Sequence, residues 1–420
     1  MAARAGPPPR GVRSLAAFRE TYPGHNWAQQ VQTLTEPDQL DPHVPEDDLS
    51  KLYEENLDID LSLWRNRVER AGRPLDTGVL MEWAREVATV KGTIKLIMIK
   101  DGRLSFPLEG QTKDHLCPGH CDVVLLQLVK DLMEWMAEDP SGWPDVLFVA
   151  NSADGGVCRH QSFEAWANGT RSKQGSGHFS CPVPVLSVIK EWGQAKDEDI
   201  LVPLTPGKEG WALHSFPWED KVDRAVWRGS HWCHSRHYAF ANETCTRTYF
   251  ALQMQESEEW RQYVDVGVLA DEVVVDKRPR SIKRAEYMPI TEAARFRYTL
   301  ALDGITASNR LAKLLGLNSV VLKQASPWIE WYYRSLLPNI HYVPFWEHSR
   351  DDVLYVIDTL REQPEKNLKA MVTRTQELAY RFLRPEARRA YWKRALVDYR
   401  KLFGDDMDDI IRKQPNPRPR

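Results

Sequence analysis

Short apolar runs and amphipathic stretches alternate through most of the chain. Runs of strand length and stretches with apolar residues at helical spacing follow one another from residue 93 to residue 345. The pattern predicts strands at 93–99, 146–150, 200–204, 264–268, 297–302, 319–322 and 340–345, and helices at 123–136, 185–192, 308–315 and 328–337. Strands that alternate with helices are typical of parallel sheets with helical crossovers, so we expect an α/β fold in two lobes.

Both ends of the chain add further segments to this pattern. Residues 351–403 are mostly helical, and the helical segment 46–90 has four apolar residues on one face: Leu80, Trp83, Ala84 and Val87. Residues 1–45 are rich in Pro, Gly and charge and are expected to form a flexible leader, and 413–420 a basic tail. The expected order is therefore a first lobe at 46–200 with its helical extension 46–90, a second lobe at 201–350, and C-terminal helices at 351–412 that pack back across the lobes.

Composition and charge exclude some classes of partner. The 56 Lys and Arg residues against 59 Asp and Glu give a net charge of -3, so the chain has no overall positive field and we expect no nucleic-acid partner. The longest apolar stretches, 93–99 and 123–129, are interrupted by Lys95 and Gln127 and fall short of the roughly 20 residues of a membrane helix. The N-terminus also lacks the apolar core of a secretory signal, so neither a membrane span nor a signal peptide is expected in this chain.

The segment 298–324 has the layout of an anion-binding loop. A strand ends at Asp303-Gly304, a small polar loop follows, and an amphipathic helix is expected to open near Ser308, with Arg310 in its first turn. Backbone N–H groups at a helix start and a guanidinium can together bind a phosphate. The alternative is an ordinary strand-loop-helix unit with Ser308 as N-cap and a solvated Arg310.

A second candidate lies at 226–236. An apolar strand end meets Arg228-Gly229-Ser230, where glycine lets the backbone approach a ligand, and Ser230 and Arg236 supply polar contacts. A surface loop is the alternative interpretation.

Metal sites are not expected. Asp197-Glu-Asp199 and Asp406-Met-Asp408 have the Asp-x-Asp spacing of a divalent-cation site, but neither follows an apolar strand, so we interpret both as solvated charged faces. Two dense clusters could offer zinc ligands, and neither has the paired spacing of a zinc finger: His231, Cys233, His234 and His237, and His115, Cys117, His120 and Cys121.

Taken together, several segments carry a family resemblance. They are Asp303-Gly304, Ser308, Arg310, Leu314-Leu315, 319–324, 330–333 and 338–344, joined upstream by Arg228-Gly229-Ser230 and by Asn151-Ser-Ala-Asp154 at a strand end. With these motifs, residues 93–346 resemble family 90 glycosyltransferases, which include the protein O-glucosyltransferases and the capsule-associated xylosyltransferases of fungi.

The resemblance implies a GT-B fold, in which two Rossmann-like lobes face a cleft, and an inverting reaction without a metal or other cofactor. Asp154 would be the general base, within reach of the acceptor hydroxyl. Ser230, Arg236 and Arg310 would hold the nucleotide diphosphate, where positive charge stabilises the leaving group. The donor site would also include Arg228, Gly229, Asp303, Gly304 and Ser308.

The implied reaction moves a sugar from a UDP-sugar, with glucose or xylose expected first, to a hydroxyl on a protein or glycan. The first lobe would carry the acceptor and the base, and the second lobe the nucleotide sugar. An alternative from another class is a pseudoenzyme that binds nucleotide sugar on the same scaffold without turnover. The presence of Asp154, Ser230, Arg236 and Arg310 favours the enzyme.

The sequence departs from the family pattern at two places. Gly155-Gly156 follow Asp154 where an aromatic residue or a Trp-Pro pair is common, and His231-Trp232-Cys233 follow Ser230 where Pro, Thr or Ser is usual. These differences bear on the acceptor side, so the acceptor stays open.

The resemblance also bears on the compartment. Cys117-Pro-Gly-His-Cys121 has turn residues between two thiols where the family often has two nearby cysteines, so a short disulfide is expected there. The implied location is the lumen of the endoplasmic reticulum or Golgi, although no signal peptide or membrane anchor is present in this chain. Asn168-Gly-Thr170 and Asn242-Glu-Thr244 would then be candidate glycosylation sites.

Overall fold

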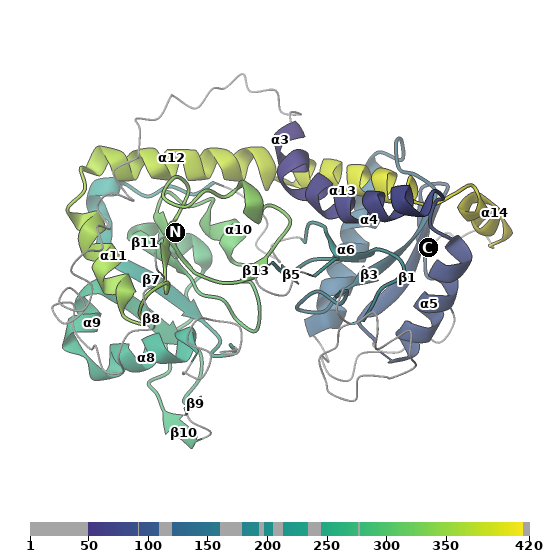
Figure 1. Cartoon of the computed structure of the whole chain (residues 1–420). Helices are drawn as coiled ribbons and strands as arrows, with labels where there is room; N and C mark the ends of the chain where they lie inside the picture. Colours follow the sequence, from purple (N-terminus) through teal and green to yellow (C-terminus); the bar gives the residue numbers. More distant parts are fainter. Residues whose placement is uncertain are drawn as a thin grey trace. The chain divides into compact units, whose positions relative to one another are not determined.

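The computed structural model describes residues 49–90, 92–108, 120–159, 179–192, 197–204, 213–233, 245–275 and 278–414. These residues form two compact units (Figure 1). Unit 1 contains the described residues of 213–327 and 336–384, and unit 2 contains those of 49–204, 328–335 and 385–414. Each unit therefore takes its residues from separate stretches of the chain.

Unit 1 is built on a five-stranded sheet in which all neighbouring strands are parallel. The strands, in sheet order, are β14 (Val343–Phe345), β12 (Val320–Gln324), β11 (Phe296–Ala301), β7 (Val222–Gly229) and β8 (Val264–Val268). The predicted strands at 264–268, 297–302, 319–322 and 340–345 are confirmed, with ends shifted by a few residues. Because the strands share one direction, their carboxyl ends lie along one edge of the sheet.

Helices and an aromatic core support this sheet. α8 (Thr246–Glu256) and α9 (Glu258–Tyr263) contact β8 (Figure 1). α11 (Asp352–Arg361) contacts β14, and α12 (Glu365–Phe382) contacts β12. The rings of Phe250 and Trp260 lie 4.9 Å apart, and Phe250 also meets Trp346 at 5.7 Å. The shorter elements are two 3-10 helices, Trp218–Asp220 and Ile290–Arg295, the helical turn α10 (Leu311–Leu314), and the hairpin of β9 (Glu272–Val275) and β10 (Arg278–Ser281).

Unit 2 has a mixed sheet. Its strands, in sheet order, are β2 (Arg103–Ser105), β1 (Ile94–Lys100), β3 (Val146–Asn151), β4 (Val185–Ser187) and β6 (Ile200–Leu201). β3, β4 and β6 are parallel, whereas β1 pairs antiparallel with β2 and with β3. The expectation of parallel sheets is therefore wrong for β1, because an unbroken apolar run shows that a strand is buried on both faces but does not encode its direction.

The helices of unit 2 come from both ends of the chain. They are α3 (Ser50–Leu52), a π-helical turn (Tyr53–Leu57), α4 (Asp58–Ala71), α5 (Thr77–Val90), α6 (His120–Glu138), α13 (Pro385–Arg400) and α14 (Asp406–Lys413). The apolar face predicted for 80–87 is confirmed, since all four of its side chains are buried in α5, which contacts β1. The predicted helix at 123–136 and the helical stretch 351–403 are also confirmed.

Two predicted helices are wrong. Residues 185–192 form β4 and β5 (Lys190–Glu191), and 328–337 begins with β13 (Trp328–Ile329) followed by a 3-10 turn at Tyr333–Ser335. β5 and β13 pair with each other in an antiparallel ribbon. The local apolar spacing of each segment fits a helix, but pairing between distant parts of the sequence determines the structure.

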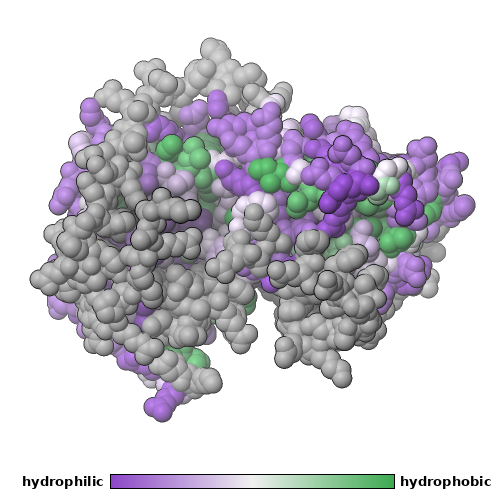
Figure 2. All heavy atoms as spheres, in the orientation of Figure 1, coloured by the Kyte–Doolittle hydropathy of each residue, from purple (hydrophilic) through white to green (hydrophobic). Residues whose placement is uncertain are grey.

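The described surface carries small apolar patches. On the face shown in Figure 2, the residues drawn in colour are mainly hydrophilic, with separate hydrophobic spots. The exposed apolar side chains include Leu126 on α6, Val274 on β9 and Trp232 in the loop after β7. Among the described residues, no helix has the length and apolar character needed to cross a membrane.

Candidate functional site

The carboxyl edge of the unit 1 sheet carries the predicted donor residues that the structure describes. β7 ends at Arg228-Gly229, with Ser230 directly after it, and β11 ends two residues before Asp303-Gly304. β7 and β11 are parallel neighbours, so the turns that follow them lie side by side. This edge is where open α/β sheets bind ligands.

Arg310 lies against the end of β7. Its guanidinium donates a hydrogen bond to the carbonyl oxygen of Arg228 and lies 5.5 Å from the centre of the Trp227 ring. A Cβ atom at Gly229 would come within 3.0 Å of Nη1 of Arg310 and 2.7 Å of the Trp227 ring. Glycine at this position therefore lets the positive charge approach the strand end closely.

A second arginine, Arg247, reaches the same edge from the first turn of α8. Its guanidinium donates to the carbonyl oxygens of Ser230 at 3.3 Å, Trp232 at 2.9 Å and Leu302 at 2.9 Å. It lies 5.2 Å from the Trp227 ring that Arg310 also faces.

Arg247 is not among the residues predicted from the sequence. A cation in the first turn of a helix is disfavoured by the positive end of the helix dipole, and this is the one local signal that marks the residue. A Cβ atom at Gly304 would lie 3.1 Å from Nη2 of Arg247, so glycine leaves room for this guanidinium too.

The turn after β11 is shaped by Asp303. Its carboxylate accepts a hydrogen bond from the backbone N–H of Ser308 at 3.1 Å, and its own N–H donates to the Gln324 side chain at 3.1 Å. Burial raises the pKa of the Asp303 carboxyl, and the nearby charge of Lys323 opposes that shift.

The helix predicted at 308–315 is confirmed only in part, because it begins at Leu311 and not near Ser308. α10 has only four residues, and Arg310 occupies its N-cap position without a side-chain capping bond. Ser308 is therefore not the N-cap of this helix. Positive charge at this edge therefore comes from arginine side chains and not from the dipole of a long helix.

Of the other two predicted arginines, Arg228 lies within the described residues and Arg236 does not. The guanidinium of Arg228 donates to the carboxylate and to the carbonyl oxygen of Asp265, both at 2.6 Å, so its charge is paired on the neighbouring strand β8. Arg236 lies outside the described residues. Arg310 and Arg247 are the two described arginines that face the Trp227 ring at this edge.

In unit 2, Asp154 follows the end of β3 in a turn organised by Asn151. The Asn151 side chain accepts from the N–H of Ala153 at 3.0 Å and donates to the carbonyl oxygen of Gly155 at 2.8 Å and to the Ser187 hydroxyl at 3.0 Å. Asp154 is half-buried at this turn, and no helix begins in the described residues 155–159. Asp154 therefore does not cap a helix within that stretch.

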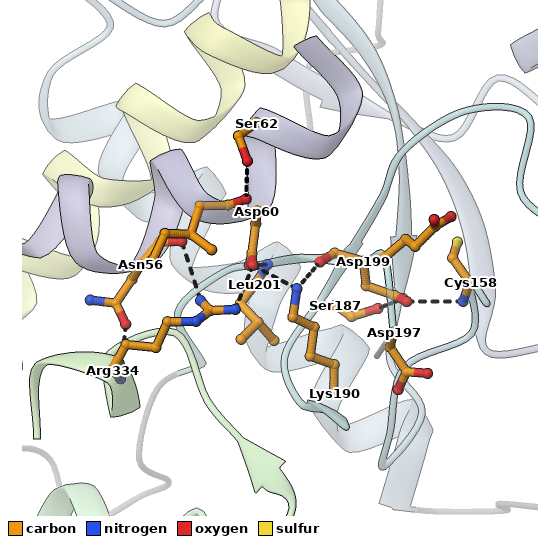
Figure 3. A network of polar contacts seen from close by, with 12 residues as sticks. Asn56, Asp60, Ser62, Cys158, Ser187, Lys190, Asp197, Asp199, Leu201 and Arg334 are labelled. Atoms are coloured by element: carbon orange, nitrogen blue, oxygen red, sulfur yellow. Dashed lines mark hydrogen bonds and ion pairs between the residues drawn. The ribbon is translucent and has the colours of Figure 1, made fainter. Parts of the chain in front are cut away.

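Gly156 and the acidic pair 197–199 stabilise the same region. Asp199 accepts from the N–H of Cys158 and from the Ser187 hydroxyl (Figure 3), and also from the N–H of Val157. Burial, with the nearby Asp197 carboxylate, raises the pKa of Asp199 to about 6. Asp197 accepts from Arg159 at 2.8 Å, and a Cβ atom at Gly156 would overlap its carboxylate.

The prediction of a solvated Asp-x-Asp is thus wrong for Asp197 and Asp199, which are fully buried and hydrogen-bonded to the protein. Asp406 and Asp408 are exposed at the start of α14, as expected, and Asp406 accepts from the N–H of Thr77 at 2.8 Å.

A buried ion cluster lies next to this pair (Figure 3). Lys190 and Asp60 are fully buried and joined at 2.6 Å, and Asp60 also accepts from Arg334 at 2.7 Å and from the Leu201 N–H at 2.9 Å. Burial lowers the pKa of Lys190, while the Asp60 charge opposes that shift. The cluster ties α4 to β5, β6 and the 328–335 segment inside unit 2.

The described cysteines form disulfides. Cys158 is bonded to Cys181 in unit 2, and Cys233 to Cys245 in unit 1, so Cys233 is not a zinc ligand. Within the described ranges, no group of three His, Cys, Asp or Glu residues could hold a metal ion. The side chains of the predicted pair Cys117 and Cys121 lie outside the described part of the structure, as do His115, His120, His234, His237, Asn168 and Asn242.

Comparison with known proteins finds a family match for the segment that contains this edge. Residues 210–409 match the family model described as Glycosyl transferase family 90. The chain carries a family 90 glycosyltransferase domain. The matched stretch of this family 90 domain includes Arg247, Arg310 and both turns of the carboxyl edge.

Curated relatives of this chain are similar to it over only part of their length. It is 26% identical over 241 residues to the O-glucosyltransferase rumi homolog of Anopheles gambiae, covering 53% of this chain and 56% of the relative. It is 28% identical over 301 residues to Protein O-glucosyltransferase 3 of Homo sapiens, covering 70% and 53%. O-glucosyltransferase rumi of Drosophila pseudoobscura pseudoobscura is 23% identical over 298 residues, covering 65% of each chain. The chain thus spans between half and two thirds of these relatives.

Proposed function

We propose that this family 90 protein transfers a sugar from a UDP-sugar to a hydroxyl group on a protein or glycan. Glucose is the first expectation, because the relatives are named O-glucosyltransferases, and xylose is the second. The reaction inverts the configuration at the sugar C1 and needs no metal or other cofactor. The GT-B arrangement of two Rossmann-like lobes belongs to the same proposal.

Support for a diphosphate site comes from the two guanidiniums that meet at one sheet edge. Arg310 and Arg247 both face the Trp227 ring. Each guanidinium lies next to a glycine that leaves room for it, Gly229 for Arg310 and Gly304 for Arg247. A departing nucleoside diphosphate gains negative charge, and arginine N–H groups stabilise that charge with paired hydrogen bonds. In this proposal Ser230 and Arg236 complete the donor site.

Support for the base comes from the turn after β3. Asn151 fixes the backbone around Asp154 through three side-chain hydrogen bonds, which leaves the carboxylate of Asp154 on a rigid turn. A general base must be held in place so that it can take the proton of the acceptor hydroxyl during attack. Asp154 is therefore assigned this role.

The cysteines support the proposed compartment. Two disulfides join the described cysteines in pairs, and disulfides persist in oxidising compartments. The lumen of the endoplasmic reticulum or Golgi is such a compartment.

A screen of UDP-sugars tests the function. The full chain is incubated with UDP-glucose, UDP-xylose and other nucleotide sugars, release of UDP and free sugar is measured, and products on candidate acceptors are identified by mass spectrometry. Slow hydrolysis of UDP-glucose or UDP-xylose is expected, because an active transferase leaks sugar to water. Binding without any release would identify the pseudoenzyme, and activity only with a GDP- or CMP-sugar would overturn the donor assignment.

A further inference from the structure

The loop that leaves β7 is joined to the start of α8 by two cross-links. The first is the disulfide between Cys233, three residues after Ser230, and Cys245, the residue directly before α8. The second is the pair of hydrogen bonds from the Arg247 guanidinium to the carbonyl oxygens of Ser230 and Trp232. The disulfide and the hydrogen bonds therefore connect the same two segments, only a few residues apart.

Apolar burial contributes little to holding this loop in place. Trp232, the largest side chain of the described loop residues, is 66% exposed and stacks on the neighbouring His231, with ring centres 5.4 Å apart. Ser230 is also exposed. A loop of this kind depends on its cross-links for a fixed position, because ordering each residue costs conformational entropy.

The position of Arg247 depends on the same loop. The dipole of α8 disfavours a cation in the first turn, and two of the carbonyl groups that compensate this charge belong to the loop. If the loop moved away from α8, Arg247 would lose these acceptors and the guanidinium could turn toward solvent.

On the basis of the donor site proposed above, we propose that the Cys233–Cys245 disulfide is a positioning bond for donor binding. It holds the 230–233 loop against α8, and the loop in turn holds the Arg247 guanidinium at the carboxyl edge of the sheet. Reduction of this one disulfide lowers the affinity for the diphosphate while the fold persists.

The two described disulfides differ in exposure, which allows a selective test. Cys158 and Cys181 are buried, with 0% and 2% of their surface exposed, whereas Cys233 and Cys245 are both half-buried. Mild dithiothreitol should therefore reduce Cys233–Cys245 first. Alkylation and peptide mass spectrometry show which bond was opened, and circular dichroism shows whether the fold persists.

The experiment measures the dissociation constant of UDP by calorimetry for the full-length protein. Mild reduction should raise the dissociation constant of UDP about tenfold, and so should the Cys233→Ser/Cys245→Ser variant. This factor corresponds to the cost of ordering one or two long side chains on binding. The serine variant is the matched control for the reductant, because dithiothreitol should change its UDP affinity no further. In an Arg247→Ala background, removal of the disulfide should add little, since the bond acts through Arg247.

Each other outcome has a distinct meaning. Unchanged UDP affinity after verified reduction overturns the positioning role and leaves the proposed function standing. An additive loss of UDP affinity in the Arg247→Ala background also overturns the positioning role. Loss of the fold on mild reduction overturns it too, because the disulfide would then be a general stabiliser of the protein. Failure of the untreated protein to bind UDP counts against the proposed function itself.

Discussion

At the scale of single residues, the candidate reactive side chains are held by neighbours with structural roles. The amide of Asn151 fixes the turn that carries Asp154, and Gly229 leaves the space that Arg310 occupies. Arg228, in contrast, is bonded to Asp265 and joins β7 to β8. Two arginines near the end of one strand can therefore have different roles, and substituting each residue by itself distinguishes these roles.

Replacement of Asp154 by Asn tests the base. Asn keeps the size of the side chain but cannot take a proton from the acceptor, so transfer should fall by about 100- to 10,000-fold. UDP affinity should stay near normal, because the arginines of the donor edge belong to unit 1. Transfer rate and calorimetry give the two readouts. Asp101→Asn is the matched control, since Asp101 is an exposed turn residue whose φ of 51° suits Asn. Equal rates for the two variants would exclude Asp154 as the base.

Replacement of the edge arginines tests the donor site. Arg310→Ala and Arg247→Ala should each weaken UDP binding by about 1.5 to 3 kcal/mol, the scale of hydrogen bonds to charged groups. Arg295→Ala serves as a control in the same unit, because the Arg295 side chain is 62% exposed and its described contacts are an ion pair with nearby Glu292 and the Phe216 ring, 5.9 Å away. Titration calorimetry with UDP measures all three. A folded Arg310→Ala protein with wild-type affinity would remove the main support for the site.

At the scale of elements, long apolar runs were predictable and long-range pairings were not. The runs at 146–150 and 264–268 form buried strands as expected. The segments 185–192 and 328–337 were assigned wrongly because β5 and β13 pair across a large gap in sequence, which no local period reveals. Arg247 was missed for a similar reason, since only the fold brings the start of α8 to the ends of β7 and β11.

The cluster that joins these elements in unit 2 should be sensitive to loss of one partner. Asp60→Asn leaves Lys190 buried without its counter-charge, so unfolding free energy should fall by about 3 to 5 kcal/mol. Asp58→Asn, two residues away, breaks only an exposed pair with Arg65 and should cost about 1 kcal/mol or less. Urea unfolding followed by circular dichroism compares the two. Equal midpoints would show that Lys190 is neutral in the folded protein.

At the scale of the whole molecule, the order of segments along the chain does not match the composition of the units. Unit 2 includes α13, where Trp392 donates to the Pro203 carbonyl oxygen at 2.9 Å and Tyr399 to that of Pro184 at 3.0 Å. The predicted base and the predicted donor residues nevertheless lie in separate units, as their order in the sequence suggested. The motifs could suggest this division because each of them follows the end of a strand. The packing partners of the terminal helices could not be predicted in this way, because they depend on tertiary packing.

The negative charge of the departing diphosphate leads to a prediction about metal dependence. A departing diphosphate needs a compensating cation, and the proposal assigns that role to Arg310 and Arg247, whose charge a chelator does not remove. Excess EDTA should therefore leave the initial rate with the best UDP-sugar within about twofold of the untreated rate. The Asp-x-Asp at 197–199 offers no alternative, because both carboxylates are buried and bonded to the protein. A collapse of the rate in EDTA that added Mn²⁺ restores would contradict the arginine mechanism and require carboxylate ligands elsewhere in the chain.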